Sequence, residues 1–166
     1  METDGPAALD AVDPGALALL LSSSGTTGLP KGAAHTHAGA VMTLRGFASF
    51  PLTELRPDDV MAGLIPMAHI FGSVMLNATL RAGARIATLP RFDLEAFLAM
   101  VQEHRVTVVP AVPPLARALA RHPLVDRYDL SSLRLVVIGA APCPVEIERE
   151  CRERLGCVVG QSFGMS

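Results

Sequence analysis

The chain has 166 residues, a formal net charge of −2 and a hydrophobic content of 50%. This length allows one medium-sized domain with a buried core, and the near-neutral charge, without a basic stripe, argues against nucleic-acid binding. No apolar run approaches the roughly 18 residues of a membrane span, so the high hydrophobic content favours an inner portion of a larger domain.

The chain opens with a segment rich in glycine and proline, and we expect residues 1–15 to be a leader or linker. Residues 16–21 are all apolar and predict a buried strand. A loop of hydroxyls and glycines follows, and residues 31–35 are expected to form a short strand. Thr36 is suited to cap a helix that reaches about residue 50.

The rest of the chain alternates between β-branched or apolar runs and helical patterns. Further strands are predicted at residues 60–65, 85–89, 106–110, 133–138 and 157–160, and further helices at residues 70–81, 94–104, 113–121 and after Pro144. This alternation predicts an α/β fold with a largely parallel sheet flanked by helices, and ligands at the carboxyl ends of its strands.

The last predicted helix carries a charge pattern as well as an apolar face. Ile147, Cys151 and Leu155 fall on one side of it. On its other sides the i,i+4 spacing predicts two ion pairs, Glu148 with Arg152 and Glu150 with Arg154.

The loop after residues 16–21 carries most of the functional information. Lys31 is the only lysine of the chain, and it follows Ser22-Ser23-Ser24-Gly25-Thr26-Thr27-Gly28-Leu29-Pro30. Glycines let backbone N–H groups turn toward an anion, hydroxyls donate hydrogen bonds, and the ammonium adds a point charge. The loop is therefore predicted to bind phosphate.

Two other interpretations of this loop fit less well. A P-loop of the form GxxxxGK[ST] has the right spacing from Gly25 to Lys31, but Pro30 removes a backbone N–H and Gly32 replaces the hydroxyl that binds magnesium. A flexible serine-glycine linker explains neither the preceding strand nor the lysine.

Other potential ligand residues give weaker signals. His35 and His37 lie two residues apart, yet no third metal ligand presents itself, so a solvated strand end or helix start is favoured. The three cysteines form no CxxC pair, which argues against structural zinc and a disulfide framework and favours a reducing cytoplasm.

Four motifs, taken together and in order, resemble those of the AMP-forming acyl-CoA synthetases. They are Ser23–Gly32 (SSGTTGLPKG), Ile65–Gly72 (IPMAHIFG), Gly139–Pro142 (GAAP) and Gln161–Ser166 (QSFGMS). The resemblance runs from about residue 16 to the end of the chain. Residues 112–114 and 124–132 resemble the branch that contains 4-coumarate–CoA ligases and luciferases.

The resemblance implies a function and a domain. Such enzymes use ATP to convert a carboxylic acid to an acyl-adenylate, and a thiol, usually that of coenzyme A, then displaces AMP. Residues 16–166 would form part of the large N-terminal domain and would end inside its last motif. The remainder of that domain, and the C-terminal domain with its catalytic lysine, would then be missing partners, and these residues alone are expected to be inactive.

The resemblance also assigns roles to residues. His69, the candidate catalytic residue, would border the acyl pocket, and Gly139, Ala140 and Ala141 would lie against adenine. The phosphate-binding residues would be Ser23, Ser24, Gly25, Thr26, Thr27, Gly28 and Lys31. The final nucleotide-binding residues would be Gln161, Ser162, Phe163, Gly164, Met165 and Ser166. Magnesium would offset the triphosphate charge, with no metal ligand assigned in this chain.

The sequence departs from the family pattern at a few positions and leaves some questions open. Ser162 and Phe163 replace Gly and Tyr, which keeps the aromatic face, and Ser166 replaces Thr and keeps the hydroxyl. Ala68 replaces a bulkier residue and would widen the acyl pocket. An amino-acid-activating domain and a non-catalytic remnant stay as alternatives, and the acid is only loosely suggested to be apolar or aromatic.

Overall fold

The computed structural model describes residues 11–23, 31–49 and 54–164. Its main feature is a five-stranded sheet with strand order β4-β3-β5-β6-β7, in which every neighbouring pair is parallel. The strands are β3 (Val60–Gly63), β4 (Arg85–Thr88), β5 (Val108–Ala111), β6 (Leu135–Ile138) and β7 (Val158–Gln161). The predicted α/β fold with a largely parallel sheet is confirmed.

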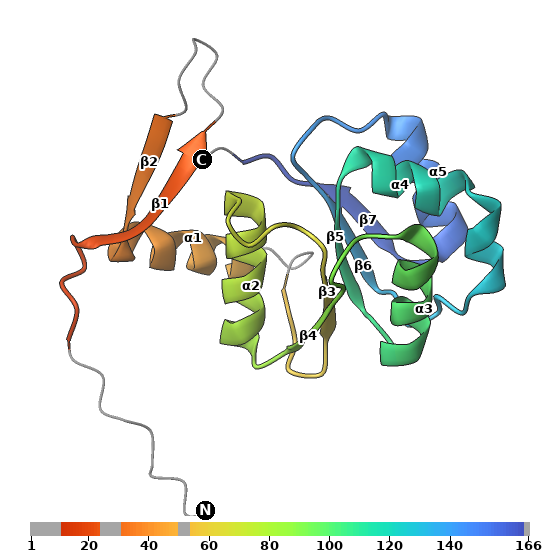
Figure 1. Ribbon diagram of the computed structural model, residues 1–166, viewed down its shortest axis with the longest axis horizontal. Coiled ribbons are helices and arrows are strands. Elements are labelled where there is room, and N and C mark those ends of the chain that lie inside the picture. Colours follow the sequence, from red (N-terminus) through yellow and green to blue (C-terminus); the bar gives the residue numbers. More distant parts are fainter. Residues whose placement is uncertain (1–10, 24–30, 50–53, 165–166) are drawn as a thin grey trace, which may run out of the picture.

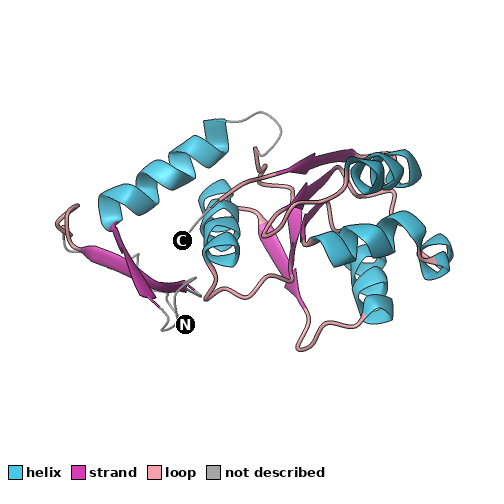
Figure 2. Ribbon diagram, turned by 90° about the horizontal axis from the view of Figure 1, so that it is seen from above, coloured by secondary structure: helices cyan, strands magenta, loops and turns pink. Residues whose placement is uncertain are grey.

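Helices cover both faces of this sheet (Figure 1). They are α1 (His37–Ser49), α2 (Ile70–Ala82), α3 (Leu94–His104), α4 (Pro113–Arg121) and α5 (Val145–Leu155), and a 3-10 helix, η1 (Pro123–Arg127), follows α4. α3, α4 and α5 lie on one side of the sheet, and α2 and then α1 lie on the other, as Figure 2 also shows. In the described part of the chain no helix combines the length and the apolar character needed to cross a bilayer.

The core consists of one larger and one smaller cluster, one on each face of the sheet. The larger packs side chains of β3, β5 and β6 against α3, α4 and α5, including Phe97, Leu119 and Ile147. The smaller packs Met61, Val108 and Leu135 against Met75 of α2. All four residues of β5 and of β6 are buried, which is typical of central parallel strands covered on both faces.

Local sequence explains where several helices begin and end. Asp93 caps α3, with its carboxylate accepting a hydrogen bond from the Ala96 N–H at 2.9 Å. Thr36 caps α1 as predicted, since its hydroxyl accepts from the Gly39 N–H at 3.1 Å. Gly83 ends α2 in the left-handed conformation, with φ of 69°.

β1 (Leu17–Ser23) and β2 (Lys31–Thr36) form a separate antiparallel pair, here called the ribbon. The prediction that residues 16–21 form a buried strand is correct for the strand and wrong for most of the burial. Leu21 is buried, whereas Leu17 and Leu20 are 59% and 67% exposed. An apolar run alone could not distinguish a two-stranded ribbon, solvated on one face, from a central strand covered on both.

Ion pairs along α5 differ in part from those predicted. Glu148 does pair with Arg152, at 2.5 Å. Glu150 instead accepts two hydrogen bonds from the guanidinium of Arg121 on α4, at 2.6 and 2.8 Å, and Arg154 pairs with Asp126 of η1. The predicted pair of Glu150 with Arg154 is wrong, because α4 and η1 offer closer partners and a two-point geometry that i,i+4 spacing does not supply.

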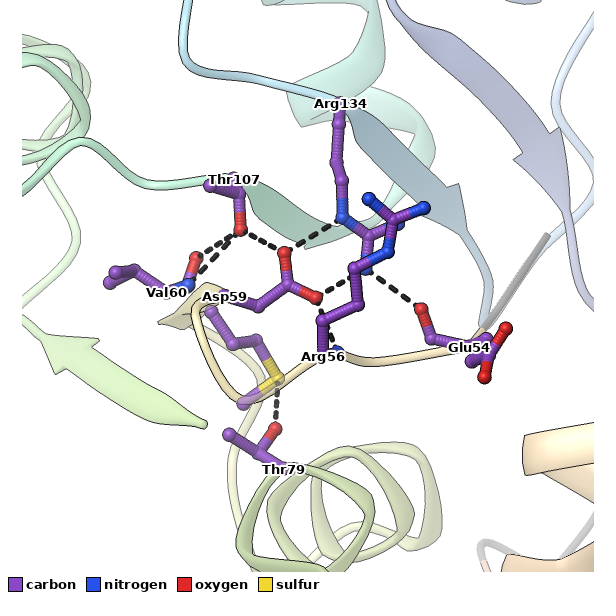
Figure 3. A network of polar contacts seen from close by, with 8 residues as sticks. Glu54, Arg56, Asp59, Val60, Thr79, Thr107 and Arg134 are labelled. Atoms are coloured by element: carbon purple, nitrogen blue, oxygen red, sulfur yellow. Dashed lines mark hydrogen bonds and ion pairs between the residues drawn. The ribbon is translucent and has the colours of Figure 1, made fainter. Parts of the chain in front are cut away.

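A polar network joins the amino ends of β3, β5 and β6 (Figure 3). Asp59, only 2% exposed, accepts hydrogen bonds from Arg134 at its guanidinium, from the Thr107 hydroxyl at 2.7 Å and from the Arg56 N–H at 2.7 Å. The Thr107 hydroxyl in turn accepts from the Val60 N–H at 3.0 Å. We call Asp59, Thr107 and Arg134 the strand-start network; it fixes three strands in register at the edge opposite the motifs.

Candidate functional site

The motif-bearing loops of the parallel sheet meet at one edge. β3 leads to the turn that contains His69, β6 leads to Gly139, and β7 leads to Ser162. Because all five strands are parallel, their carboxyl ends lie together, and this is where α/β proteins bind ligands. The structure therefore brings the second, third and fourth motifs to one place, here called the carboxyl edge.

Phe71 at the start of α2 joins these loops in space. A Cβ placed on Gly139 would lie 3.0 Å from Phe71 Cε1 and 3.1 Å from Ser162 Oγ. Residues from three separate motifs are thus in contact range of one another. A glycine at position 139 leaves the narrow gap in which these side chains approach the end of β6.

His69 lies at the N-cap of α2 and is exposed. Its Nδ1 accepts a hydrogen bond from the Phe71 N–H at 3.2 Å, which fixes the ring relative to the helix start. The turn before it is compact, because a Cβ on Gly72 would lie only 2.2 Å from the Pro66 carbonyl oxygen. Gly72 is therefore required for the position of His69, a role that the motif comparison did not assign to it.

The turn after β6 has an unusual backbone. Ala140 has φ of 70°, in the left-handed region that alanine rarely adopts, and both Ala140 and Ala141 are exposed. Gly139 is buried and donates its N–H to the Ala111 carbonyl at 2.9 Å. The small side chains leave this backbone accessible at the carboxyl edge, and left-handed alanine conformations are found where function or packing requires them.

The end of β7 supplies both an anchored residue and an exposed one. Ser162 donates its N–H to the Ile138 carbonyl at 2.8 Å and so stays beside the turn after β6. Phe163 follows with its side chain 90% exposed, and Gly164 is the last described residue. The Gln161 amide forms hydrogen bonds with the Cys143 backbone and with Glu148, although the residue is exposed. Met165 and Ser166 lie outside the described residues.

The predicted phosphate loop joins the two strands of the ribbon. Ser23 and Lys31 are paired in the register of β1 and β2, so they mark the two ends of this loop. Ser24, Gly25, Thr26, Thr27 and Gly28 lie outside the described residues. The ribbon is thus a hairpin beside the parallel sheet, and the loop does not follow a strand of that sheet as the sequence suggested. In both Figures 1 and 2 residues 162–164, which follow β7, run from the sheet in the direction of the ribbon.

The described residues contain no group of three His, Cys, Asp or Glu side chains placed to hold a metal ion. His35 and His37 line a cavity of about 300 Å³ between the ribbon, α1 and α2, together with apolar side chains, Ser73 and Asn77. The described part of the carboxyl edge thus offers backbone, hydroxyl, imidazole and aromatic groups, and no carboxylate cluster.

Comparison with protein families gives one match that spans nearly the whole chain. Residues 2–166 match the model of the AMP-binding enzyme family. Similar curated proteins include 4-coumarate–CoA ligase 2 from Oryza sativa subsp. japonica, 44% identical over 94% of this chain, and 4-coumarate–CoA ligase 3 from Arabidopsis thaliana, 42% identical over 90%. The chain spans 28% and 27% of the length of these two relatives.

Solved structures agree with this assignment. A natural red-emitting luciferase from Phrixothrix hirtus is 34% identical, with a TM-score of 0.80 over 88% of this chain and 28% of its own. The amide bond synthetase McbA from Marinactinospora thermotolerans is 32% identical, with a TM-score of 0.82 over 97% of this chain and 32% of its own. The N-terminal domain of FACL13 from Mycobacterium tuberculosis has a TM-score of 0.82 at 25% identity, covering 94% of this chain and 39% of that domain. Family match, sequence relatives and fold agree: the chain belongs to the AMP-binding enzyme family, in its 4-coumarate–CoA ligase-like branch.

Proposed function

We propose that the protein containing these residues uses ATP to activate a carboxylic acid as an acyl-adenylate and then forms a thioester with coenzyme A. The observation that carries this proposal is the meeting of three motifs at the carboxyl edge, through Phe71, Gly139 and Ser162. The relatives named 4-coumarate–CoA ligase support the same reaction class.

Two parts of the edge fit two parts of an acyl-adenylate. The small side chains of Gly139, Ala140 and Ala141 leave room for a flat purine against the turn, where Ala140 and Ala141 are exposed, and the exposed ring of Phe163 could stack on it. His69 and Phe71 stand at the start of α2, on the side proposed for the acyl group. The apolar and aromatic character of Phe71 favours an apolar or aromatic acid.

We assign the triphosphate tail to the loop of the ribbon. Ser23, Ser24, Gly25, Thr26, Thr27, Gly28 and Lys31 would hold the β- and γ-phosphates that leave as pyrophosphate. Two anions must approach each other when a carboxylate attacks the α-phosphate, so neutralising charge and aligning the reactants are the main tasks. We assign Gly164, Met165 and Ser166 to the part of the site that would contact the α-phosphate of ATP.

Magnesium would accompany ATP and offset its charge. The described residues supply no carboxylate cluster for it, so the proposal uses no protein ligand and routes no step through the ion. Residues 16–166 are proposed to contribute part of the adenylation domain, in keeping with the 27–28% of the length of the two ligases named above that the chain spans. Its three free, buried cysteines fit a reducing cytoplasm.

The test is ATP–pyrophosphate exchange by the complete gene product with a panel of aromatic, fatty and amino acids. Exchange that depends on an aromatic or fatty acid, followed by thioester formation with coenzyme A, is the expected result. Exchange with amino acids alone would instead indicate an amino-acid-activating domain. Absence of exchange with every acid would contradict the proposal and favour a non-catalytic remnant.

A further inference from the structure

The side chain of Gln161, the last residue of β7, holds the loop that follows β6. Its Oε1 accepts a hydrogen bond from the Cys143 N–H at 2.9 Å, and its Nε2 donates to the Cys143 carbonyl at 3.1 Å. One side chain therefore binds both backbone groups of a loop residue, as a neighbouring strand would. Cys143 lies two residues beyond Ala141, so this contact fixes the turn of Gly139 to Ala141 relative to β7.

Glu148 of α5 fixes the orientation of that amide. Its Oε2 accepts from Gln161 Nε2 at 2.9 Å, and its Oε1 accepts from Arg152 at 2.5 Å. Arg152 also donates to the Val159 carbonyl of β7 at 3.0 Å. Because an ionised carboxylate only accepts hydrogen bonds, Gln161 must present its NH₂ group to Glu148, which leaves its oxygen for the Cys143 N–H.

We call Gln161, Glu148 and Arg152, with the Cys143 backbone, the Gln161 clamp. It connects two segments of the carboxyl edge, the turn with Ala140 and the end of β7 with Phe163. Ala140 has a φ of 70°, and such a conformation persists only where the surroundings over-determine it. The clamp provides that constraint from outside the hydrophobic core, since Gln161 and Arg152 are exposed residues.

We propose that Gln161 and Glu148 are positioning residues for nucleotide binding, which act through the backbone of residues 139–143 and set its distance from Phe163. This inference rests on the proposed function, because it takes the carboxyl edge as the purine site. It changes the role expected for Gln161 from direct contact with the nucleotide to support of the turn that contacts it.

The first measurement is the affinity of the complete gene product for ATP, by titration calorimetry. Gln161→Ala is expected to weaken ATP binding about tenfold, with the KM for the acid unchanged. Glu148→Ala should weaken it similarly, because the amide loses its fixed orientation. Glu148→Gln should restore only part of the affinity, since its carbonyl oxygen can still accept from Gln161 but its NH₂ group cannot accept from Arg152. Glu153→Gln, on the same helix but in an exposed pair with Arg149 at 4.0 Å, is the matched control.

The second measurement is the rate at which iodoacetamide labels the thiol of Cys143 in the loop after β6, followed by peptide mapping. Cys143 is buried, and burial raises the pKa of its thiol. The thiol should therefore react slowly while the hydrogen bonds of the Gln161 clamp are intact. Gln161→Ala should speed labelling of Cys143 at least fivefold. Cys151 and Cys157 are buried in the core and should keep their wild-type rates in the same sample, which excludes general unfolding.

The outcomes separate this inference from the proposed function. Unchanged ATP affinity in Gln161→Ala, or labelling of Cys143 that stays slow, would overturn the positioning role even if the enzyme forms acyl-adenylates normally. Wild-type protein that binds no ATP would overturn it as well. If ATP binds and the variants behave as expected, yet no acid supports exchange, the positioning role stands and the proposed reaction fails.

Discussion

Single glycines decide the geometry of the carboxyl edge. Gly72 allows the start of α2 to approach the Pro66 carbonyl, and Gly139 allows Phe71 and Ser162 to converge. Neither role depends on a side chain that could touch a ligand. Motif comparison found both residues, but only the spatial arrangement shows which neighbour each one makes room for.

Gly72→Ala should destabilise the protein, because the new methyl group would lie 2.2 Å from the Pro66 oxygen, in contact with backbone that cannot easily move. We expect a loss of about 1–3 kcal/mol in the free energy of unfolding, measured by urea denaturation. Gly46→Ala is the matched control, since Gly46 lies in α1 with no atom within 4 Å of the added Cβ. The free energy of unfolding of Gly46→Ala should be about 0.5–1 kcal/mol higher than that of the wild type. Equal effects of the two substitutions would contradict the close approach.

Lys31→Ala should slow acyl-adenylate formation in the complete gene product. Loss of one electrostatic stabiliser of a charged transition state costs on the order of 10²-fold in rate. The measurement is ATP–pyrophosphate exchange with the acid that the panel identifies. Arg45→Ala, which removes another exposed cation from the helix after the ribbon, should leave the rate within about twofold. An unchanged rate for Lys31→Ala would remove this residue from the phosphate site.

Elements are held together at opposite ends of the strands by different means. The Gln161 clamp acts near the carboxyl edge, whereas the strand-start network fixes the amino ends of β3, β5 and β6. Burial by itself would raise the pKa of Asp59, but hydrogen bonds from Arg134, Thr107 and the Arg56 N–H outweigh it and lower the pKa from 3.8 to about 2. Asp59 is therefore expected to stay ionised wherever the protein is folded near neutral pH.

The stability that Asp59 contributes should depend on pH. Its pKa is lower in the folded state, so the contribution is complete above pH 4 and is lost as the pH falls from about 4 to about 2. A shift of this size corresponds to about 2 kcal/mol. Urea unfolding at several pH values should show this loss in the wild type and not in Asp59→Asn. Asp126→Asn, whose side chain is 71% exposed, should retain the wild-type profile in this window. A wild-type profile in Asp59→Asn would contradict this assignment.

At the scale of the whole molecule, the parallel sheet was predictable and the ribbon was not. β-branched and apolar runs such as residues 106–110 predict both ends of β5 to within two residues, because a central strand is apolar on both faces. The pairing of residues 16–21 with β2 depends on a partner strand that periodicity does not identify. The Gln161 clamp could not be predicted from the sequence for a similar reason, because Cys143 and Glu148 lie 18 and 13 residues before Gln161 in the chain.

The exposed leucines of the ribbon should make these 166 residues self-associate when they are expressed alone. Leu17 and Leu20 place apolar surface in solvent, and contiguous surface of this kind promotes association. Sedimentation velocity should show association that increases with concentration and that decreases in Leu17→Ser/Leu20→Ser. Leu21→Ser, at a buried position of the same strand, should lower stability instead. A monodisperse wild-type sample would count against this expectation.

The exposure of Phe163 has a practical consequence. These 166 residues contain no tryptophan, and the ring of Phe163 is 90% in water. An indole introduced as Phe163→Trp would therefore emit at the red-shifted wavelength of a hydrated fluorophore, and a purine stacked on it would quench that emission. Optical titration at this single position would then report occupancy of the carboxyl edge directly, before any reaction takes place.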